Sequence, residues 1–196
     1  MILDDDNKLI TEPRKLGKLS IKLPLAPSFM MTLWGNDEKF IEKYLSDSPG
    51  YYTSGDAGFI DEEGYVHVMT RLDDVINTAG HRLSTYQMEE VLINHKDIVE
   101  SAVVARLDDL KGEIPVGFVV LKTGAEHDPL VLEKLLVKMM RTEIGPICCF
   151  RTCMVLNSLP KTRSGKILRN VLKGMVRGTA YKVPPTISDI DILPDI

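Results

Sequence analysis

Apolar and polar residues alternate in the first part of the chain in a way that favours β-strands. Residues 18–23 alternate polar and apolar side chains, as expected of a strand with one buried face, and residues 65–69 do so again. Residues 61–64 are three acidic residues followed by glycine, and they predict the turn of a hairpin. Residues 37–45 can place apolar side chains on one side of a short helix. We therefore expect a β-rich first part with one helix.

The second part of the chain combines helices with strands. Ser84 and Gln87 have the spacing of a capping box, and the apolar positions that follow predict a helix. Two runs rich in β-branched residues, 98–105 and 114–121, predict strands. The polar residues 108–112 between them predict a connecting loop.

The pattern continues with two further helices and one strand. Asp128 followed by Pro129 is typical of a helix start, with an N-cap and a proline at the first helical position. The apolar positions after it recur at helical spacing. Residues 150–156 predict a strand, and residues 167–176 predict an amphipathic helix.

This order of elements predicts an α+β fold. Residues 73–180 would form a small α/β domain. Residues 1–72 show no obvious core of their own, so we interpret them as the β-rich end of a larger, incomplete domain. Residues 181–196 contain a proline pair and several aspartates, and they predict an extended tail.

Composition narrows the possible functions. A formal net charge of −4 is unfavourable for a general nucleic-acid binder, and 44% hydrophobic residues is ordinary for a globular protein. No apolar run is long enough to cross a bilayer, and the acidic start has neither a signal-peptide nor a transit-peptide pattern. Cys148, Cys149 and Cys153 fit neither a metal clamp nor a disulfide framework, so we expect them to be buried, reduced thiols.

The strongest candidate for chemistry is the segment 159–166, which reads Leu-Pro-Lys-Thr-Arg-Ser-Gly-Lys. Its proline and glycine predict a loop, and the basic helix expected after it would place Lys166 at or near a helix N-terminus. An ammonium there could stabilise negative charge that develops on a phosphate or carboxylate. The segment does not match the phosphate-binding P-loop, because isoleucine follows Lys166. An ordinary basic surface loop is the alternative.

Two weaker candidates lie earlier in the chain. Arg71 and Arg82 are fixed cations suited to phosphate or ribose, and Gly80 suits a turn that a ligand can approach closely. Asp56 follows Gly55, which we interpret as a turn, and its carboxylate could accept hydrogen bonds from a ribose diol. Each feature alone is equally compatible with a polar linker or a common turn. We expect no metal site, since the aspartates at 73 and 74 lack further acidic partners.

Together these segments resemble the adenylate-forming superfamily of acyl-CoA synthetases, in the branch of acetyl- and propionyl-CoA synthetases. The similarity runs from about residue 17 to residue 181, and the segment 159–166 is its most specific part. The resemblance is strongest to the mitochondrial short-chain group. It implies the small carboxy-terminal domain of the adenylate-forming fold, preceded by the end of the large amino-terminal domain.

The resemblance also implies a two-step reaction and a role for each candidate residue. A short-chain carboxylate and ATP, accompanied by Mg²⁺, give an acyl-adenylate and pyrophosphate, and the adenylate then acylates CoA. The implied roles are adenylation lysine for Lys166, ATP or AMP contacts for Asp56, Arg71 and Arg82, CoA contacts for Ala79, Gly80 and Arg141, and domain hinge for Asp73.

Three further expectations follow from the resemblance. The large domain with the acyl pocket is missing, so this chain alone should not catalyse adenylation and its main partner would be that domain. The resemblance places the enzyme in the mitochondrial matrix, and we expect neither a nucleic-acid nor a membrane partner. The alternatives are a truncated relative that serves as a non-catalytic binding module, and a family member that adenylates a different acid.

Overall fold

The computed structural model describes residues 1–189. The chain forms two compact units, which divide between Val75 and Ile76. The predicted boundary after residue 72 lies three residues earlier, and the assignment of these units to a large and a small domain of one enzyme stays a prediction.

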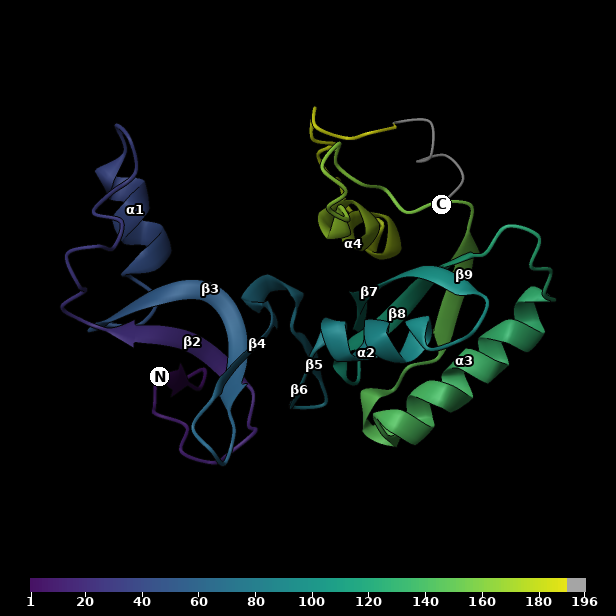
Figure 1. Cartoon of the computed structure of the whole chain (residues 1–196), viewed down its shortest axis with the longest axis horizontal. Coiled ribbons are helices and arrows are strands. Elements are labelled where there is room, and N and C mark those ends of the chain that lie inside the picture. Colours follow the sequence, from purple (N-terminus) through teal and green to yellow (C-terminus); the bar gives the residue numbers. More distant parts are fainter. Residues whose placement is uncertain (190–196) are drawn as a thin grey trace. The chain divides into compact units, whose positions relative to one another are not determined.

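The first unit is an antiparallel sheet of four strands in the order β1-β2-β3-β4, accompanied by one helix (Figure 1). The elements are β1 Ile2–Leu3, β2 Gly17–Lys22, α1 Asp37–Tyr44, β3 Tyr51–Ile60 and β4 Val66–Arg71. Helix α1 begins where the Asn36 side chain accepts a hydrogen bond from the Lys39 backbone N–H. Ile2, Leu3, Phe40 and Ala57 are buried in this unit.

The strand predicted at residues 18–23, the short helix and the hairpin turn at residues 61–64 are confirmed. The long strand β3 was not predicted. It contains Gly55 and Asp56, so the interpretation of Gly55 as a turn is wrong. Three residues, 54–56, separate the pairs Ser20–Thr53 and Lys18–Ala57, whereas β2 has only one residue between them. Gly55, with φ +82°, therefore lies in an irregularity of the strand rather than at its end.

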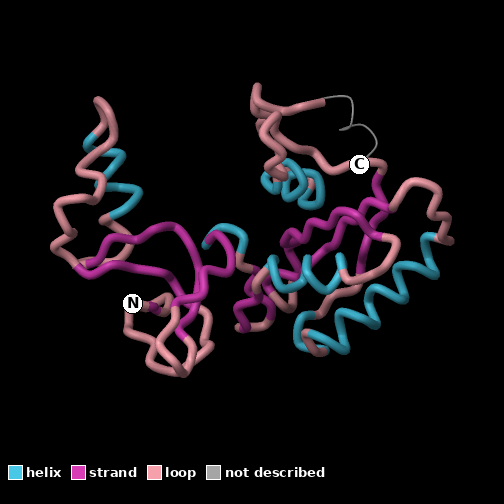
Figure 2. The backbone as a smooth tube through the Cα atoms, in the orientation of Figure 1, coloured by secondary structure: helices cyan, strands magenta, loops and turns pink. Residues whose placement is uncertain are grey.

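The second unit is a five-stranded mixed sheet with helices on both faces. Its sheet strands are β5 Ile76–Thr78, β6 His81–Leu83, β7 Ile98–Asp108, β8 Gly112–Leu121 and β9 Thr152–Leu156. Its helices are α2 Thr85–Ile93, α3 Pro129–Glu143 and α4 Arg169–Arg177. Strands β7 and β8 form a long antiparallel hairpin, and β9 runs parallel to β8 (Figure 2).

Alternating residues of β7 separate the core of this unit into two layers. Val103 and Ala105 face the cluster that contains the apolar sides of α2 and α3, whereas Ala102 and Val104 face the cluster that contains Leu172 of α4. Helices α2 and α3 thus cover one face of the sheet and α4 covers the other (Figure 1). The predicted α+β class is confirmed.

Local signals set the helix starts. The Ser84 hydroxyl accepts from Gln87 N–H at 3.4 Å, and the Asp128 carboxylate accepts from the N–H groups of Leu130 and Val131 at 2.9 and 3.0 Å. Both predicted caps are therefore confirmed. Within residues 1–189, no helix is both long enough and apolar enough to cross a membrane.

The described residues also contain two short 3-10 helices, η1 at Leu72–Asp74 and η2 at Pro146–Cys148. Cys148 and Cys153 are buried free thiols, as expected. The expectation was wrong for Cys149, which is only partly buried. It ends η2 in the left-handed conformation, with φ +53°, and its Sγ lies 2.7 Å from Lys111 Nζ.

Candidate functional site

Asp56, Arg71 and Asp73 come together at the end of strand β4. Asp56 and Arg71 are opposite each other in the register of β3 and β4, and Arg71 Nη1 lies 3.3 Å from Asp56 Oδ1. Arg71 Nε lies 3.5 Å from Asp73 Oδ1. Half of the Arg71 side chain is exposed, and an exposed ion pair of this kind contributes little stability. These groups can therefore exchange their mutual contacts for a polar ligand at low cost.

Gly55 suits this arrangement, because its φ of +82° is a conformation that other residues rarely adopt. A Cβ atom at position 55 would lie 2.9 Å from Arg71 Nη2 and 3.2 Å from Nη1, so the end of the arginine side chain would have to shift. The guanidinium crosses the backbone where glycine leaves room for it. The strand irregularity thus presents the Asp56 carboxylate and the Arg71 guanidinium side by side.

Lys166 ends a small hairpin formed by residues 161–167. An antiparallel bridge joins Lys161 to Ile167, and Thr162 N–H donates to the Lys166 carbonyl at 2.8 Å. The Thr162 hydroxyl accepts from Lys166 N–H at 3.1 Å. Gly165, with φ +85°, closes the turn, and its N–H donates to the Thr162 carbonyl at 2.8 Å. Thr162 therefore holds the backbone of Lys166 on both its N–H and its C=O side.

Lys166 lies near a helix N-terminus, as predicted, but it precedes the first residue of the helix by three positions. Helix α4 begins at Arg169, its N-cap is Leu168, and no side chain caps it. Residues 166 and 167 belong to the hairpin, and Leu168 N–H donates to the Pro160 carbonyl at 2.8 Å. The helix therefore begins after Leu168. Lys166 is exposed, and its ammonium makes no hydrogen bond or ion pair with any residue in the range 1–189.

Two ion pairs hold the residues at the two ends of the hairpin to the sheet and to helix α2 of the second unit. The Lys161 ammonium contacts the Glu100 carboxylate at the start of β7. Arg169, three residues after Lys166, donates from Nη2 to both carboxylate oxygens of Glu89 in α2, at 2.7 and 2.9 Å. Glu89 Oε1 also accepts from Val103 N–H of β7 at 2.9 Å. The position of Lys166 is thus set from both sides of its loop.

Two of the three predicted CoA contacts, Ala79 and Gly80, form the tight turn between β5 and β6. Ala79 and Gly80 both have positive φ, +49° and +84°, which a two-residue hairpin turn of this type requires. Ala79 N–H donates to the Lys111 carbonyl at 2.9 Å, so the turn rests on the tip of the β7–β8 hairpin. Gly80 is exposed, and no atom lies within 4 Å of where its Cβ would be. A ligand can approach this backbone closely.

Arg82 and Arg141 lie in the same unit. Arg82 is on β6, opposite Asn77 of β5, and is partly buried. Arg141 is exposed in the last turn of α3. Burial raises the pKa of the Cys148 thiol, and the Arg141 charge, a smaller effect, opposes that rise. Arg141 lies in α3 and the Ala79–Gly80 turn lies between β5 and β6, so the predicted CoA contacts come from different elements of the second unit.

The Lys166 hairpin and the Ala79–Gly80 turn lie at opposite ends of the β7–β8 hairpin. The Lys166 hairpin is fastened to Glu100 near the start of β7, whereas the turn rests beside Gly112, where β8 begins. Asp108, the partner of Gly112, lies eight positions after Glu100. At ~3.3 Å per residue, Glu100 and Asp108 are roughly 26 Å apart along the strand.

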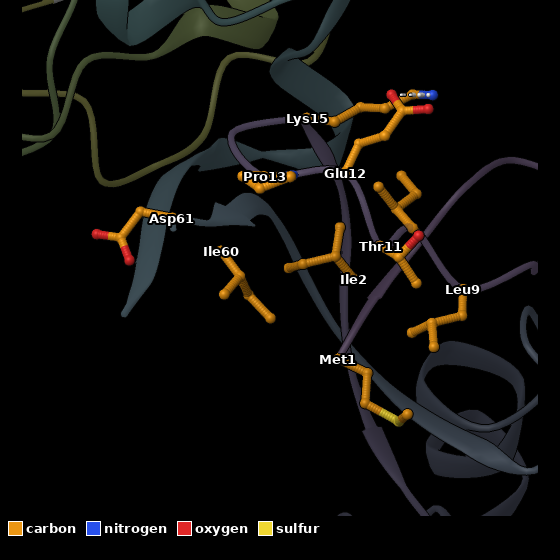
Figure 3. Close-up of a pocket in the computed structure, with 10 residues that line it drawn as sticks. Met1, Ile2, Leu9, Thr11, Glu12, Pro13, Lys15, Ile60 and Asp61 are labelled. Carbon is orange, nitrogen blue, oxygen red and sulfur yellow. Dashed lines mark ion pairs between the residues drawn. The ribbon is translucent and has the colours of Figure 1, made fainter. Parts of the chain in front are cut away.

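A hollow in the first unit contains none of the predicted site residues. It is lined by ten residues of the segments 1–15 and 60–61, including Ile2, Pro13 and Ile60 (Figure 3). Its walls are mainly apolar side chains, and its charged side chains are those of Glu12, Lys15 and Asp61. No group of three or more potential metal ligands occurs within residues 1–189.

Sequence reasoning missed the residues that fasten Lys166. Glu89 and Glu100 are single acidic residues among many, and nothing in their local pattern indicates that they meet Arg169 and Lys161, which are 80 and 61 positions away. The only available signal was indirect. Glu89 precedes the buried position Leu92 by three residues and therefore lies on the same side of α2.

Comparison with known proteins shows which proteins this chain is similar to. The model of the AMP-binding enzyme C-terminal domain matches residues 87–166, ending at Lys166. The mitochondrial acyl-CoA synthetase short-chain family member B of Dictyostelium discoideum is 49% identical over 93% of this chain. The mitochondrial acyl-CoA synthetase short-chain family member 3 of Mus musculus is 47% identical over 98% of it.

The solved structure of ATP-bound MatB from Rhodopseudomonas palustris matches with a TM-score of 0.73 and 25% identity, over 89% of this chain and 33% of that one. The chain spans 26% and 28% of the length of the two curated relatives. Nearly the whole chain is thus similar to a part of the mitochondrial short-chain acyl-CoA synthetases, and residues 87–166 match the AMP-binding enzyme C-terminal domain.

Proposed function

We propose that this chain is the carboxy-terminal part of an ATP-dependent short-chain acyl-CoA ligase, with propionate or acetate as its acid. The observation that carries the proposal is the hairpin that presents Lys166. Its ammonium is exposed, it has no ionic partner within residues 1–189, and its backbone is fixed on both sides by Thr162. A fixed, unneutralised cation of this kind suits a site where negative charge develops.

Lys166 would act in the first half-reaction. The substrate carboxylate attacks the α-phosphorus of ATP, the acyl-adenylate forms and pyrophosphate leaves. Negative charge accumulates on the phosphate oxygens in the transition state, and the Lys166 ammonium would stabilise it. Mg²⁺ would enter with ATP, because this ion is commonly held by substrate phosphates and only one or two carboxylates.

Asp56, Arg71 and Arg82 would bind the nucleotide. The Asp56 carboxylate is about one-third exposed beside Arg71, so it can accept hydrogen bonds from the two ribose hydroxyls. Arg71 would make a second nucleotide contact, and Arg82 would contact the ATP phosphates, for which a guanidinium is well suited. Asp73, which follows Arg71 in η1, would be the hinge between the two units.

Ala79, Gly80 and Arg141 would contact CoA in the second half-reaction. The exposed Ala79–Gly80 turn offers backbone that CoA can approach closely, and Arg141 can bind a phosphate group of CoA. Lys166 and this turn are held at opposite ends of the β7–β8 hairpin. One placement of the second unit therefore need not serve both half-reactions, and a rotation about Asp73 would bring each end to the bound adenylate in turn.

The partner that this proposal requires is the large domain of the same enzyme, with the acyl pocket and the remaining ATP contacts. We infer a mitochondrial matrix location, because the two relatives compared above carry that organelle in their names. The alternative function is a binding module without catalysis. It predicts that joining the chain to a large domain yields no adenylation.

The test uses this chain joined to the upstream large domain of a short-chain relative. Both half-reactions are measured with propionate, as pyrophosphate release and as conversion of supplied propionyl-adenylate to propionyl-CoA. The Lys166→Ala variant should lose ~10²–10³-fold in pyrophosphate release, the size of effect seen when one transition-state donor is removed. Thioester formation from supplied adenylate should stay unchanged.

Lys182→Ala is the matched control, because Lys182 is exposed and makes no contact in the described residues. It should leave both half-reactions unchanged. Equal loss of both half-reactions in Lys166→Ala would contradict the assigned role. If the intact protein forms no adenylate with any short acid, the ligase proposal fails and the binding module becomes the better explanation.

A further inference from the structure

The hairpin that carries Lys166 is too small to be stable alone. It contains only the short pairing between residues 161–162 and 166–167. An isolated two-stranded hairpin is marginal in water, and three or more strands are usually needed for a stable sheet. The ion pair of Lys161 and the helix after Leu168 hold its two ends, but neither pairs with the backbone of the turn itself.

The tail of the chain supplies the missing strand. Arg163 N–H donates to the Thr186 carbonyl at 2.9 Å, and Ser188 N–H donates to the Lys161 carbonyl at 2.8 Å. The Ser188 hydroxyl donates to the same carbonyl at 3.1 Å. Thr162 and Ile187 form an antiparallel bridge. Residues 161–163 are therefore the middle strand of a three-stranded ribbon, with Lys166 on one edge and the tail on the other.

The path of the tail is fixed by its packing on helix α4. The helix ends at Gly178, in the left-handed conformation with φ +62°. Tyr181 then packs on Gly174, where a Cβ would lie only 2.6 Å from the Tyr181 Cβ. A turn follows, in which Ile187 N–H donates to the Pro184 carbonyl at 3.0 Å. The glycine in α4 thus lets the tail return across the helix to the Lys166 hairpin.

We propose that residues 184–188 are a positioning element for Lys166. This inference rests on the proposed function and deepens it. The tail touches neither the lysine ammonium nor, in the proposed mechanism, any substrate. It holds residues 161 and 163, on either side of Thr162, and Thr162 holds both backbone groups of Lys166. Without the tail, the turn opens more often and Lys166 spends less time where it can stabilise the adenylation transition state.

The decisive variant is Ser188→Pro. Proline has no backbone N–H and no hydroxyl, so the Lys161 carbonyl loses both of its donors from the tail, while the core of the second unit is untouched. Ser188→Ala removes only the hydroxyl and should give a smaller effect of the same kind. Lys182→Pro is the matched control, because it places a proline in the same tail outside the ribbon. Deletion of residues 184–196 is the second test variant.

The first readout is hydrogen exchange of the 196-residue chain, which does not depend on any enzymatic activity. In Ser188→Pro, the amides of residues 163–166 should exchange roughly 10-fold faster, the effect expected from losing about one to two net hydrogen bonds. Exchange in β7 and β8 should stay unchanged. Unchanged exchange at residues 163–166 would overturn the ribbon.

The second readout is catalysis by the chain joined to its large domain. Ser188→Pro should lower the rate constant of pyrophosphate release roughly 10-fold, with little change in KM for ATP, and should spare thioester formation from supplied adenylate. A merely structural tail would instead lower both half-reactions through loss of folded protein.

Each combination of outcomes is decisive. Faster exchange together with unchanged adenylation, in a protein that Lys166→Ala inactivates, would overturn the positioning role. A wild-type protein that forms no adenylate would overturn the proposed function and the catalytic part of this inference with it. The exchange data would still decide whether the ribbon exists.

Discussion

Replacing Arg169 by alanine should destabilise the second unit, because it breaks the contact between the start of α4 and the Glu89 carboxylate. Arg169 Nη2 donates to both oxygens of Glu89, at 2.7 and 2.9 Å, and Nε donates to Oε1 at 3.3 Å. The Glu89 side chain is 12% exposed and that of Arg169 is 27% exposed. Without the guanidinium, the carboxylate keeps Val103 N–H as a donor but loses the partner cation.

The magnitude follows from these contacts. Hydrogen bonds to charged groups contribute about 1.5–3 kcal/mol each, and breaking a fully buried ion pair costs about 3–5 kcal/mol. The pair is partly exposed and Glu89 keeps one donor, so we expect Arg169→Ala to lower the free energy of unfolding by about 2–3 kcal/mol. With a urea m-value of about 1–3 kcal/mol per molar, the midpoint should fall by roughly 1–2 M.

The assay is urea unfolding of the 196-residue chain followed by circular dichroism at 222 nm. Tryptophan fluorescence would not serve, because the single tryptophan, Trp34, lies in the first unit and is fully exposed. Arg163→Ala is the matched control, since this arginine lies in the loop that precedes α4 and its side chain is exposed. Its free energy of unfolding should change by less than about 0.5 kcal/mol.

A double-mutant cycle with Glu89→Ala isolates the pair itself. The two single variants should cost more in sum than the double variant, by at least about 1 kcal/mol. If Arg169→Ala unfolds at the same urea concentration as Arg163→Ala, the contact does not hold α4 to the sheet. The account of how the Lys166 hairpin is fastened would then be wrong.

Two further predictions concern titratable groups. Burial raises the pKa of the Cys153 thiol to about 12, so at pH 8.5 only ~0.03% of it is thiolate. Iodoacetamide should label Cys153 only after unfolding in urea, and rapid labelling of the native chain would contradict its burial. A hydrogen bond from His127 lowers the pKa of Asp97 below its ordinary value of 3.8. Its stabilising contribution is present above pH ~4 and is lost as the pH falls through the lowered pKa. Asp97→Asn should therefore flatten the loss of stability between pH 4 and pH 2, measured by urea unfolding, and an unchanged acid profile would refute the link.

The sequence predicted elements whose signals are local. The side chains of Ser84 and Asp128 cap the helices that their patterns indicated, because an N-cap needs only residues two or three positions away. Alternation and β-branched runs located β7 and β8 for the same reason. These signals do not depend on what the rest of the chain does.

The errors fall where a distant residue decides the local structure. Gly55 was interpreted as a turn, yet it lies inside β3, because the residues on either side of it pair with the distant segment 17–22. The helix was predicted to begin at residue 167, yet residue 167 pairs with residue 161 and the helix begins at Arg169. In both places the local sequence is compatible with two structures, a turn or a strand at Gly55 and a helix or a hairpin after Gly165. Contacts with distant residues decide which of the two forms.

The same limit explains why sequence could suggest Lys166 but not what fixes its position. The motif 159–166 identifies the lysine, since its composition is local. Its position depends on Glu89, on Glu100 and on the tail at residues 186–188, all of which contact the loop through the fold. These contacts lie at one end of the β7–β8 hairpin, and the Ala79–Gly80 turn rests on the other. The two ends of the β7–β8 hairpin therefore keep separate geometries within one unit. Under the proposed function, substitutions in the tail should affect adenylation alone, and substitutions at the turn should affect thioester formation alone.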